Sequence, residues 1–271
     1  MTRLTFLGTG TSQGVPVISC GCWVCRSDDP RDKRLRSSVW VEHEGVSLVI
    51  DAGPDFRQQM LRAGVDDVDA ILLTHSHKDH IGGIDDVRAF NYTRRRSIDI
   101  YGTRPTLDRV RVEYDYAFGE NRYPGVPDIE LREIDPARPF TVKGVEIVPV
   151  QGLHLQMPVV GYRIGKIAYL TDFKEITPRE VEKLKGVEIL VVNALRREWH
   201  YSHFNIDEAL HLRWLVGPER TYFTHMSHQM GRHGSVEQEI QSCELNRTVW
   251  LAYDGLRVET SDADTVLHDE K

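Results

Sequence analysis

The stretch 72–83, LLTHSHKDHIGG, constrains the fold of this chain more than any other part of its sequence. Its first residues are typical of a buried β-strand that ends at Thr74. Four residues of metal-binding type follow this strand: His75, His77, Asp79 and His80. In an extended chain His75 and His77 share one face, and the later pair reaches a second position after the turn. Imidazole and carboxylate are ligands that zinc, manganese and iron take in hydrolytic sites, so the stretch predicts a metal site at a strand end.

A site for two metal ions needs more ligands than one loop supplies, and three further candidates stand later in the chain. They are His154, Asp172 and His225. Each follows an apolar run, which places its side chain at the edge of a sheet facing a cleft. Taken singly, such a residue is more often a turn residue or a hydrogen-bonded histidine. Taken as a set, in this order and together with the motif at 75–80, they predict metal ligands.

A second cluster of metal-binding type lies near the N-terminus, in the stretch SCGCWVC at 19–25. Its thiols, Cys20, Cys22 and Cys25, make poor disulfide partners, because one is always left over and the closed loops would be very short. Three thiolates supply most of a tetrahedral zinc site and need one more ligand. The remaining cysteine, Cys243, stands far downstream and is interpreted as a small core residue.

Composition and charge restrict the class of protein. Hydrophobic residues make up 40% and charged residues 28% of the 271 residues, which is ordinary for a globular protein with a sizeable core. No apolar run is long enough to span a bilayer and the N-terminal residues show no targeting segment, so we expect a cytoplasmic protein with reduced thiols. The net charge of −7 argues against a protein that binds long nucleic acid. The basic run Arg94, Arg95 and Arg96 is interpreted as a solvated loop.

Short β-branched runs predict strands, with helical patterns between some of them. Strands are expected near 3–8, 37–44, 47–53, 69–75, 145–150, 166–172, 188–194, 221–225 and 256–259. Helices are expected near 55–63, 104–114, 177–185, 205–216 and 235–244. Asn205 or Asp207 caps the fourth of these helices, another helix begins at Gly82 and Gly83, and 115–139 forms a long surface loop. The grouping favours an α+β fold, a sandwich of mixed sheets with helices outside, over a doubly wound parallel sheet.

The motif His-x-His-x-Asp-His, followed by His, Asp and His in that order, resembles the metallo-β-lactamase superfamily. The resemblance extends over nearly the whole chain, from LGTGTSQGVP to YDGLRV. It implies a single domain over 1–271, an αββα sandwich of two mixed β-sheets flanked by helices, with a two-metal site at one sheet edge. It also implies the two ligand sets: His75, His77 and His154 for one metal ion, and Asp79, His80 and His225 for the other, with Asp172 bridging.

The cysteine cluster resembles that of the PhnP-type (phosphoribosyl) cyclic phosphodiesterases, which carry a structural zinc on three cysteines and one histidine. The matching histidine is His228, three residues beyond His225, which would tie the zinc loop at 19–26 to the active site. The segment SHFNIDEAL resembles one in which a histidine, here His203, reaches the substrate, and His200 nearby matches less well. A further polar run is present, but the spacing of its residues does not indicate a role. It consists of Asp85, Asp86, Arg88 and Asn91.

The resemblance implies a metal-dependent hydrolase that cleaves a small or cyclic phosphodiester of nucleotide or phosphoribosyl type. Two active-site zinc or manganese ions would activate the attacking water beside Asp79, and His203 would protonate the leaving group. We expect a small phosphodiester or nucleotide as partner, no long nucleic acid, no membrane, and a monomer or homodimer. Two alternatives stay open: a tRNA 3′-end endonuclease, which needs a flexible arm and a basic surface, and a PqqB-like small-molecule-binding protein of cofactor biosynthesis.

Overall fold

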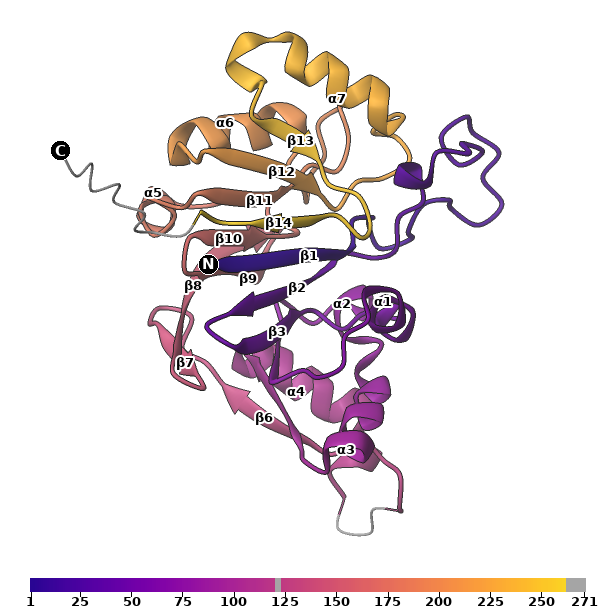
Figure 1. Ribbon diagram of the computed structural model, residues 1–271, viewed down its shortest axis with the longest axis vertical. Helices are drawn as coiled ribbons and strands as arrows, with labels where there is room; N and C mark the ends of the chain where they lie inside the picture. The colour runs from indigo at the N-terminus through magenta and orange to yellow at the C-terminus, as the bar shows by residue number, and fades with distance from the viewer. Residues whose placement is uncertain (120–122, 262–271) are drawn as a thin grey trace, which may run out of the picture.

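Two mixed seven-stranded sheets pack face to face in the computed structural model, which describes residues 1–119 and 123–261 (Figure 1). The first sheet, in spatial order, consists of β14 (Arg257–Glu259), β1 (Thr2–Gly8), β2 (Ser38–His43), β3 (Val46–Ile50), β4 (Ala70–Leu72), β5 (Ile98–Gly102) and β6 (Ile129–Glu133). The second consists of β13 (Val249–Leu251), β12 (Arg220–Thr224), β11 (Ile189–Asn193), β10 (Ile167–Leu170), β9 (Met157–Ile164), β8 (Val145–His154) and β7 (Phe140–Val142). In each sheet an antiparallel part joins a parallel part, at β3 in the first sheet and at β10 in the second. The expected sandwich of two mixed sheets is confirmed.

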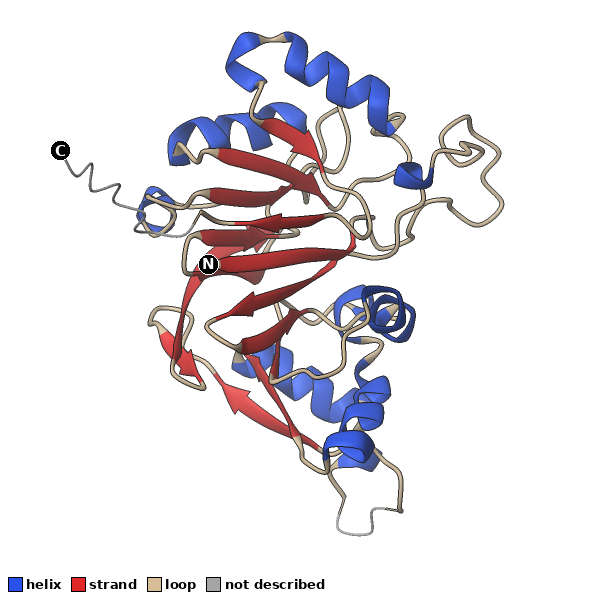
Figure 2. Cartoon of the chain, in the orientation of Figure 1, coloured by secondary structure: helices blue, strands red, loops and turns tan. Residues whose placement is uncertain are grey.

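Helices cover the outer face of each sheet (Figure 2). Those on the first sheet are α1 (Phe56–Ala63), α2 (Lys78–Ile81), α3 (Arg88–Arg94) and α4 (Arg104–Glu113). Those on the second are α5 (Pro178–Glu182), α6 (Ile206–Val216) and α7 (His233–Ser242). Short 3-10 turns complete the described part of the chain at Pro30–Asp32, Ile84–Val87, Asp115–Ala117 and Glu244–Asn246.

The buried apolar side chains form three layers, as four layers of secondary structure require. The central layer joins the inner faces of the two sheets, where Phe6 and Leu48 of the first sheet lie in one cluster with Tyr162 of the second. Alternate residues of the same strands point outward and pack under the helices, Ile71 with Met60 of α1, for example. The corresponding outer layer of the second sheet holds α5, α6 and α7. The sandwich therefore exposes only its strand ends and connecting loops, which is where a functional site can form.

Local sequence explains how α6 begins. Asn205 is its N-cap, and its side chain accepts from the backbone N–H of Glu208 while Glu208 accepts from that of Asn205. This capping box satisfies two backbone donors that would otherwise be unpaired. Of the two expected caps, Asn205 is therefore the correct one.

The segment 115–139 was expected to be a surface loop, and this expectation is wrong for its second half. Residues 129–133 form β6, which pairs in parallel with β5 at the edge of the first sheet. The charged residues in β6 reflect an edge strand, which is tolerated with little apolar burial because one side of the strand faces solvent. β5, β7, β9 and β13 are likewise strands that the apolar runs did not predict. Residues 120–122 lie outside the described part of the chain.

A helical segment does begin at Gly83, as expected, because Gly83 is the N-cap of the 3-10 helix Ile84–Val87, which leads directly into α3. The short α2 ends just before it, with Gly82 as its C-cap. Gly83 serves close packing: a Cβ at this position would lie 2.0 Å from the carbonyl oxygen of Gly53. A Cβ at Gly53 would lie 1.9 Å from the carbonyl oxygen of Asp79. These glycines let the loop after β3 lie directly against the metal-binding motif.

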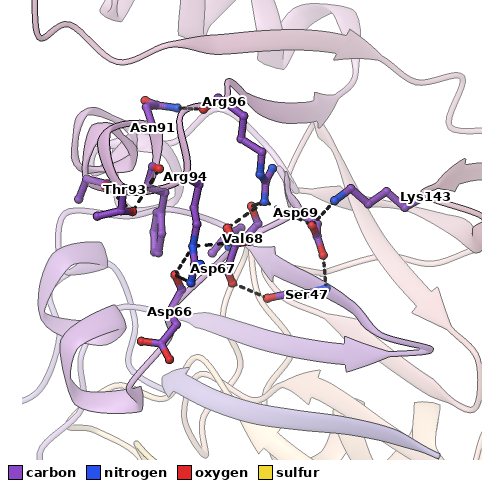
Figure 3. A network of polar contacts seen from close by, with 12 residues as sticks. Ser47, Asp66, Asp67, Val68, Asp69, Asn91, Thr93, Arg94, Arg96 and Lys143 are labelled. Atoms are coloured by element: carbon purple, nitrogen blue, oxygen red, sulfur yellow. Dashed lines mark hydrogen bonds and ion pairs between the residues drawn. The ribbon is translucent and has the colours of Figure 1, made fainter.

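The basic run 94–96 is largely neutralised within the protein (Figure 3). Arg96 forms ion pairs with Asp67 at 2.8 Å and Asp69 at 3.3 Å, and Lys143 contacts Asp69 as well. Arg94 donates to the backbone carbonyl of Asp66. Arg94 and Arg95 are exposed, as expected for a solvated run, whereas Arg96 is partly buried. The contacts of Arg94 and Arg96 also hold the loop before β4. Within residues 1–119 and 123–261, none of the helices has the length and apolar character that a membrane span requires.

Candidate active site and metal-binding clusters

The predicted site residues come together at one edge of the sandwich, although they come from both sheets. The chain leaving β4 carries His75, His77, Asp79 and His80. The other three follow strands of the second sheet: His154 ends β8, Asp172 follows β10 and His225 follows β12. His75, His80, Asp172 and His225 are buried, whereas His77 is exposed, so the cluster opens to solvent on the side of His77.

Three imidazole rings form the first part of the cluster. The ring centroids of His75 and His77 lie 4.7 Å apart, those of His77 and His154 5.1 Å, and those of His75 and His154 5.8 Å. This is the set that the resemblance assigns to one metal ion.

Carboxylates dominate the second part of the cluster. His80 Nε2 lies 3.2 Å from Asp79 Oδ2 and 3.3 Å from Asp172 Oδ2, and His225 Nδ1 lies 3.2 Å from the same oxygen of Asp172. The Asp172 carboxylate also lies within 4.8 Å of ligand atoms of His75 and His154. Asp172 therefore stands between the two sets, where a bridging ligand would stand.

The donor atoms fit divalent cations. His75 Nε2 and His80 Nε2 are buried and have no hydrogen-bond partner among the described residues, which is costly for polar atoms unless something else binds them. In a tetrahedral site with bonds of about 2.0–2.2 Å, nitrogen and oxygen ligands lie about 3.3–3.6 Å apart. The nitrogen–oxygen distances around His80 agree with that spacing.

Neighbouring groups orient the imidazoles. His80 Nδ1 lies 2.7 Å from Asp51 Oδ2, and Asp51 also accepts from the backbone N–H of Thr74 at 2.9 Å and from the Thr74 hydroxyl. His154 Nδ1 donates to the carbonyl oxygen of Ser202 at 2.8 Å. Both contacts leave Nε2 free for a metal ion, as outer hydrogen bonds to metal-binding histidines do. Sequence reasoning missed Asp51, although it follows an apolar run just as Asp172 does.

Backbone strain is concentrated at this edge. Asp51, Asp172 and His225 are non-glycine residues with φ values of 65°, 63° and 56°. Such left-handed conformations cost energy for residues with a Cβ and are found where the surrounding structure enforces them, often at functional sites. Here they turn each side chain out of its strand direction and toward the cluster.

Electrostatics favours a cation at the same place. Burial disfavours the imidazolium of His80, but the carboxylates of Asp51, Asp172 and Asp79 together raise the pKa of His80 well above its ordinary value. Burial also opposes ionisation of Asp172, yet His225 and His80 hold the pKa of Asp172 well below its usual range. Ionised carboxylates buried this closely require positive charge between them, which a divalent cation supplies.

His203 lies against the cluster, whereas His200 lies further out. The His203 ring is 4.5 Å from that of His154 and 4.8 Å from that of His225, and His203 Nδ1 is 3.6 Å from Asp172 Oδ1. Burial lowers the pKa of His203 to about 2, even though Asp172 raises it, so its imidazole is neutral in the free site. His200 is 5.3 Å from His203, ring to ring, and is less buried.

The cysteine cluster gathers around His228. Sγ of Cys20, Cys22 and Cys25 lies 3.3, 3.4 and 3.5 Å from Nδ1 of His228. In tetrahedral zinc coordination, Zn–S bonds of about 2.3 Å and Zn–N bonds of about 2.0 Å place sulfur and nitrogen about 3.5 Å apart. The four donor atoms therefore fit one zinc ion with no open coordination position. Cys243, expected in the core, is exposed at the end of α7, and that expectation is wrong.

The polar run at 85–91 belongs to a different part of the surface. Asp85 pairs with Arg88 at 2.8 Å and accepts from the Tyr116 hydroxyl at 2.6 Å. Asp86, Arg88 and Asn91 line a cavity of about 920 Å³ together with residues of α1, and none of the predicted metal ligands lines it. The residues of this run are therefore not part of the candidate metal site.

Four layers with a cluster of histidines and aspartates at one sheet edge define a class, the metal-binding αββα sandwich proteins. Residues 47–226 match the beta-lactamase superfamily domain, and the chain belongs to that superfamily. The fold and family expected from the motif are thus confirmed.

The chain is similar to curated proteins with different names. It is 41% identical over 256 residues to an octanoyltransferase of Porphyromonas gingivalis, covering 94% of this chain and 51% of that protein. It is 30% identical over 182 residues to a ribonuclease Z of Methanopyrus kandleri, covering 64% of this chain and 58% of that protein. The chain therefore spans about half the length of these relatives.

Two solved structures match this chain over nearly the full length of both proteins. A diphosphatase of the PhnP family has a TM-score of 0.86 and 36% identity, covering 95% of this chain and 96% of that one. Zinc-bound PqqB of Methylobacterium extorquens has a TM-score of 0.73 at 19% identity, covering 95% of this chain and all (100%) of that one, and so shares the fold.

Proposed function

We propose that this protein is a metal-dependent hydrolase of small or cyclic phosphodiesters. The observation that carries the proposal is the convergence of seven histidine and aspartate side chains at one sheet edge, where two buried imidazole nitrogens have no hydrogen-bond partner among the described residues. The likeness to a PhnP-family diphosphatase along nearly the whole chain supports it. A diphosphate and a phosphodiester present the same kind of electrophile, a phosphorus atom with anionic oxygens and a leaving group that departs with negative charge.

In this proposal His75, His77 and His154 hold one divalent ion, and Asp79, His80 and His225 hold a second, with Asp172 shared. Bound zinc or manganese would supply Lewis acidity, which lowers the pKa of water and neutralises charge on phosphoryl oxygens. The cysteines and His228 hold a separate zinc with a structural role.

The protein's own groups orient and move protons. Asp51 fixes the ring of His80 by accepting a hydrogen bond from its Nδ1–H. The Ser202 carbonyl oxygen accepts from the Nδ1–H of His154 in the same way. Asp79, which is less buried than Asp172, stands on the open side where water enters. We assign the proton transfer to the leaving oxygen to His203, because its ring borders the cluster and its Nδ1 has no hydrogen-bond partner in the described structure. Since this imidazole is neutral in the free site, it would first take up a proton from solvent, which an anionic substrate bound beside it favours, and would then give that proton to the leaving oxygen.

Two other functions are weighed against this one. The likeness to a ribonuclease Z favours RNA cleavage, but that match covers 64% of the chain. Two arginines of the basic run at 94–96, Arg94 and Arg96, also pair with the chain's own aspartates. The octanoyltransferase similarity concerns about half of a longer protein. Covalent acyl transfer uses an activated nucleophile such as cysteine or lysine, whereas the site built here consists of histidines and aspartates.

The test is a substrate screen with the metal-loaded protein. It should cleave bis-p-nitrophenyl phosphate and 2′,3′-cyclic nucleotides, and activity should vanish with a chelator and return with Mn²⁺ or Zn²⁺. The proposal is wrong if thioesters or lactams are hydrolysed while bis-p-nitrophenyl phosphate, cyclic nucleotides, phosphoribosyl cyclic phosphate and diphosphates are not.

A further inference from the structure

The loop 195–204, which carries His203, is fixed at its base and exposed at its tip. The backbone N–H of Leu195 donates to the Phe204 carbonyl at 2.9 Å, and the Phe204 N–H donates to the Phe173 carbonyl at 2.8 Å. The Asn205 side chain donates to the Arg197 carbonyl at 3.1 Å. A loop held this way presents its tip in a defined position, as a preorganised binding surface requires.

Aromatic rings lead from the candidate metal site to the tip of this loop. The series begins with His154 and His203, 4.5 Å apart, continues to His200 at 5.3 Å and ends at Tyr201, which stacks on His200 at 4.4 Å with an interplanar angle of 29°. Tyr201 is 57% exposed, so most of this residue remains accessible although its ring stacks on His200.

Trp199 provides a second exposed ring on the same loop. It is 62% exposed, and Lys174 Nζ lies 4.8 Å from its ring centroid. Lys174 is itself held by an ion pair with Glu208 at 2.5 Å, so that one face of the indole is backed by a fixed cation. Large exposed aromatic rings are unfavourable in water, and two on one anchored loop beside a catalytic cluster indicate a binding surface.

A cation without a carboxylate partner stands at the base of the same loop. Arg196 donates to the Gln229 side chain at 2.7 Å and to the backbone carbonyls of Glu198 and Trp199. Across residues 1–119 and 123–261, the hydrogen bonds of its guanidinium go to an amide oxygen and to backbone carbonyls, and none goes to a carboxylate. Its charge therefore remains available to an anion bound at this side of the site.

We propose that Trp199 and Tyr201 form a stacking wall for a planar base, and that the substrates of this site are nucleotide-type phosphodiesters. This inference rests on the proposed function and makes it more specific. The phosphodiester lies at the metal cluster beside His203, the sugar passes His200, and the base lies against the exposed rings. Arg196 adds attraction for the anionic substrate. Base–aromatic stacking accepts any base, so the wall selects nucleotides as a class and not one sequence.

The experiment compares two substrates that differ only in the base. 2′,3′-Cyclic AMP and the 2′,3′-cyclic phosphate of methyl riboside have the same sugar and the same diester, and the second carries a methoxy group in place of adenine. Wild type should show a kcat/KM at least about fivefold higher for cyclic AMP, since stacking of one base contributes about 1–3 kcal/mol, equivalent to about 5–150-fold. Tyr201→Ala and Trp199→Ala should each lose most of that preference, and Tyr201→Phe should keep it. Tyr92→Ala, at an exposed tyrosine on α3, is the matched control and should change nothing.

A binding measurement separates this inference from the proposed reaction. Equilibrium dialysis of AMP and ribose 5-phosphate with the metal-loaded protein should show tighter binding of AMP, and Tyr201→Ala should abolish the difference. If both diesters are cleaved equally and both ligands bind equally, the wall is refuted and the phosphodiesterase function stands. If no diester is cleaved but AMP binds preferentially through Tyr201, the wall stands and the reaction is wrong. Equal binding without cleavage refutes both.

Discussion

Replacing Asp51 by Asn tests whether the contacts around the cluster orient a metal ligand. Asp51 Oδ1 accepts from the backbone N–H of Thr74 at 2.9 Å, and Oδ2 faces His80 Nδ1 at 2.7 Å. An Asn side chain must keep its oxygen toward Thr74 N–H, because two donors would otherwise meet, and it then presents its NH₂ group to His80. The imidazole is thereby forced to accept at Nδ1 and carry its proton on Nε2, the atom that points into the cluster.

The expected effect is a loss of metal affinity without loss of the fold. Replacing an outer partner of a metal ligand typically costs 10–100-fold in affinity, about 1.4–2.7 kcal/mol. Burial raises the pKa of Asp51, so a neutral amide removes a desolvation cost, and Asn tolerates the φ of 65° at this position. The assay is a competition titration of active-site metal against a chromophoric chelator, with the cysteine-bound zinc as internal standard.

A control substitution shows whether a loss of metal affinity is specific to Asp51. Asp69→Asn also replaces a partly buried aspartate by its amide, but in the Arg96 and Lys143 network away from the site, and should leave metal affinity unchanged. An Asp51→Asn protein that binds metal as tightly as wild type, at equal melting temperature, would refute the proposed role of His80 Nε2 as a ligand.

Three further predictions follow from the site. His203→Ala should lower turnover by about 10²–10⁴, as loss of acid catalysis does, with metal content unchanged by elemental analysis; unchanged turnover would remove His203 from the mechanism. His228→Ala should lose about one zinc and much thermal stability, because structural zinc binding is coupled to folding, whereas His77→Ala should lose active-site metal only; full zinc retention by Cys22→Ser would disprove the cysteine site. Pre-tRNA should be a poor substrate at physiological salt, and efficient, salt-sensitive processing would contradict the choice of a small substrate.

The sequence predicted the site better than it predicted the sheets. Each candidate metal ligand at the sheet edge follows an apolar run, and strand ends meet at one edge. This position, together with the motif at 75–80, brought His154, Asp172 and His225 into the prediction. The edge strand β6 escaped because its charged residues carry no apolar alternation. The role of Gly83 could not be read from the sequence either, since a close approach to the Gly53 carbonyl depends on tertiary packing.

Residues that act through others were the hardest to predict. Asp51 directly follows β3 and Asp172 stands two residues after β10, and nothing in the two local sequences says which carboxylate faces the cluster and which supports an imidazole. The proposed role of the aromatic residues in the loop 195–204 was equally hard to predict, because it depends on their exposure and on their position next to His203.

The division of the ligands between the two sheets has a consequence for the order in which the protein matures. His75 to His80 follow a strand of the first sheet and the other ligands follow strands of the second, while the cysteine cluster waits for His228, about two hundred residues further along. Neither cluster can close on a growing chain until synthesis has passed His228 and both sheets have packed. Metal would thus be loaded only after β12 has been made, and a chain truncated before β12 would lack part of each cluster.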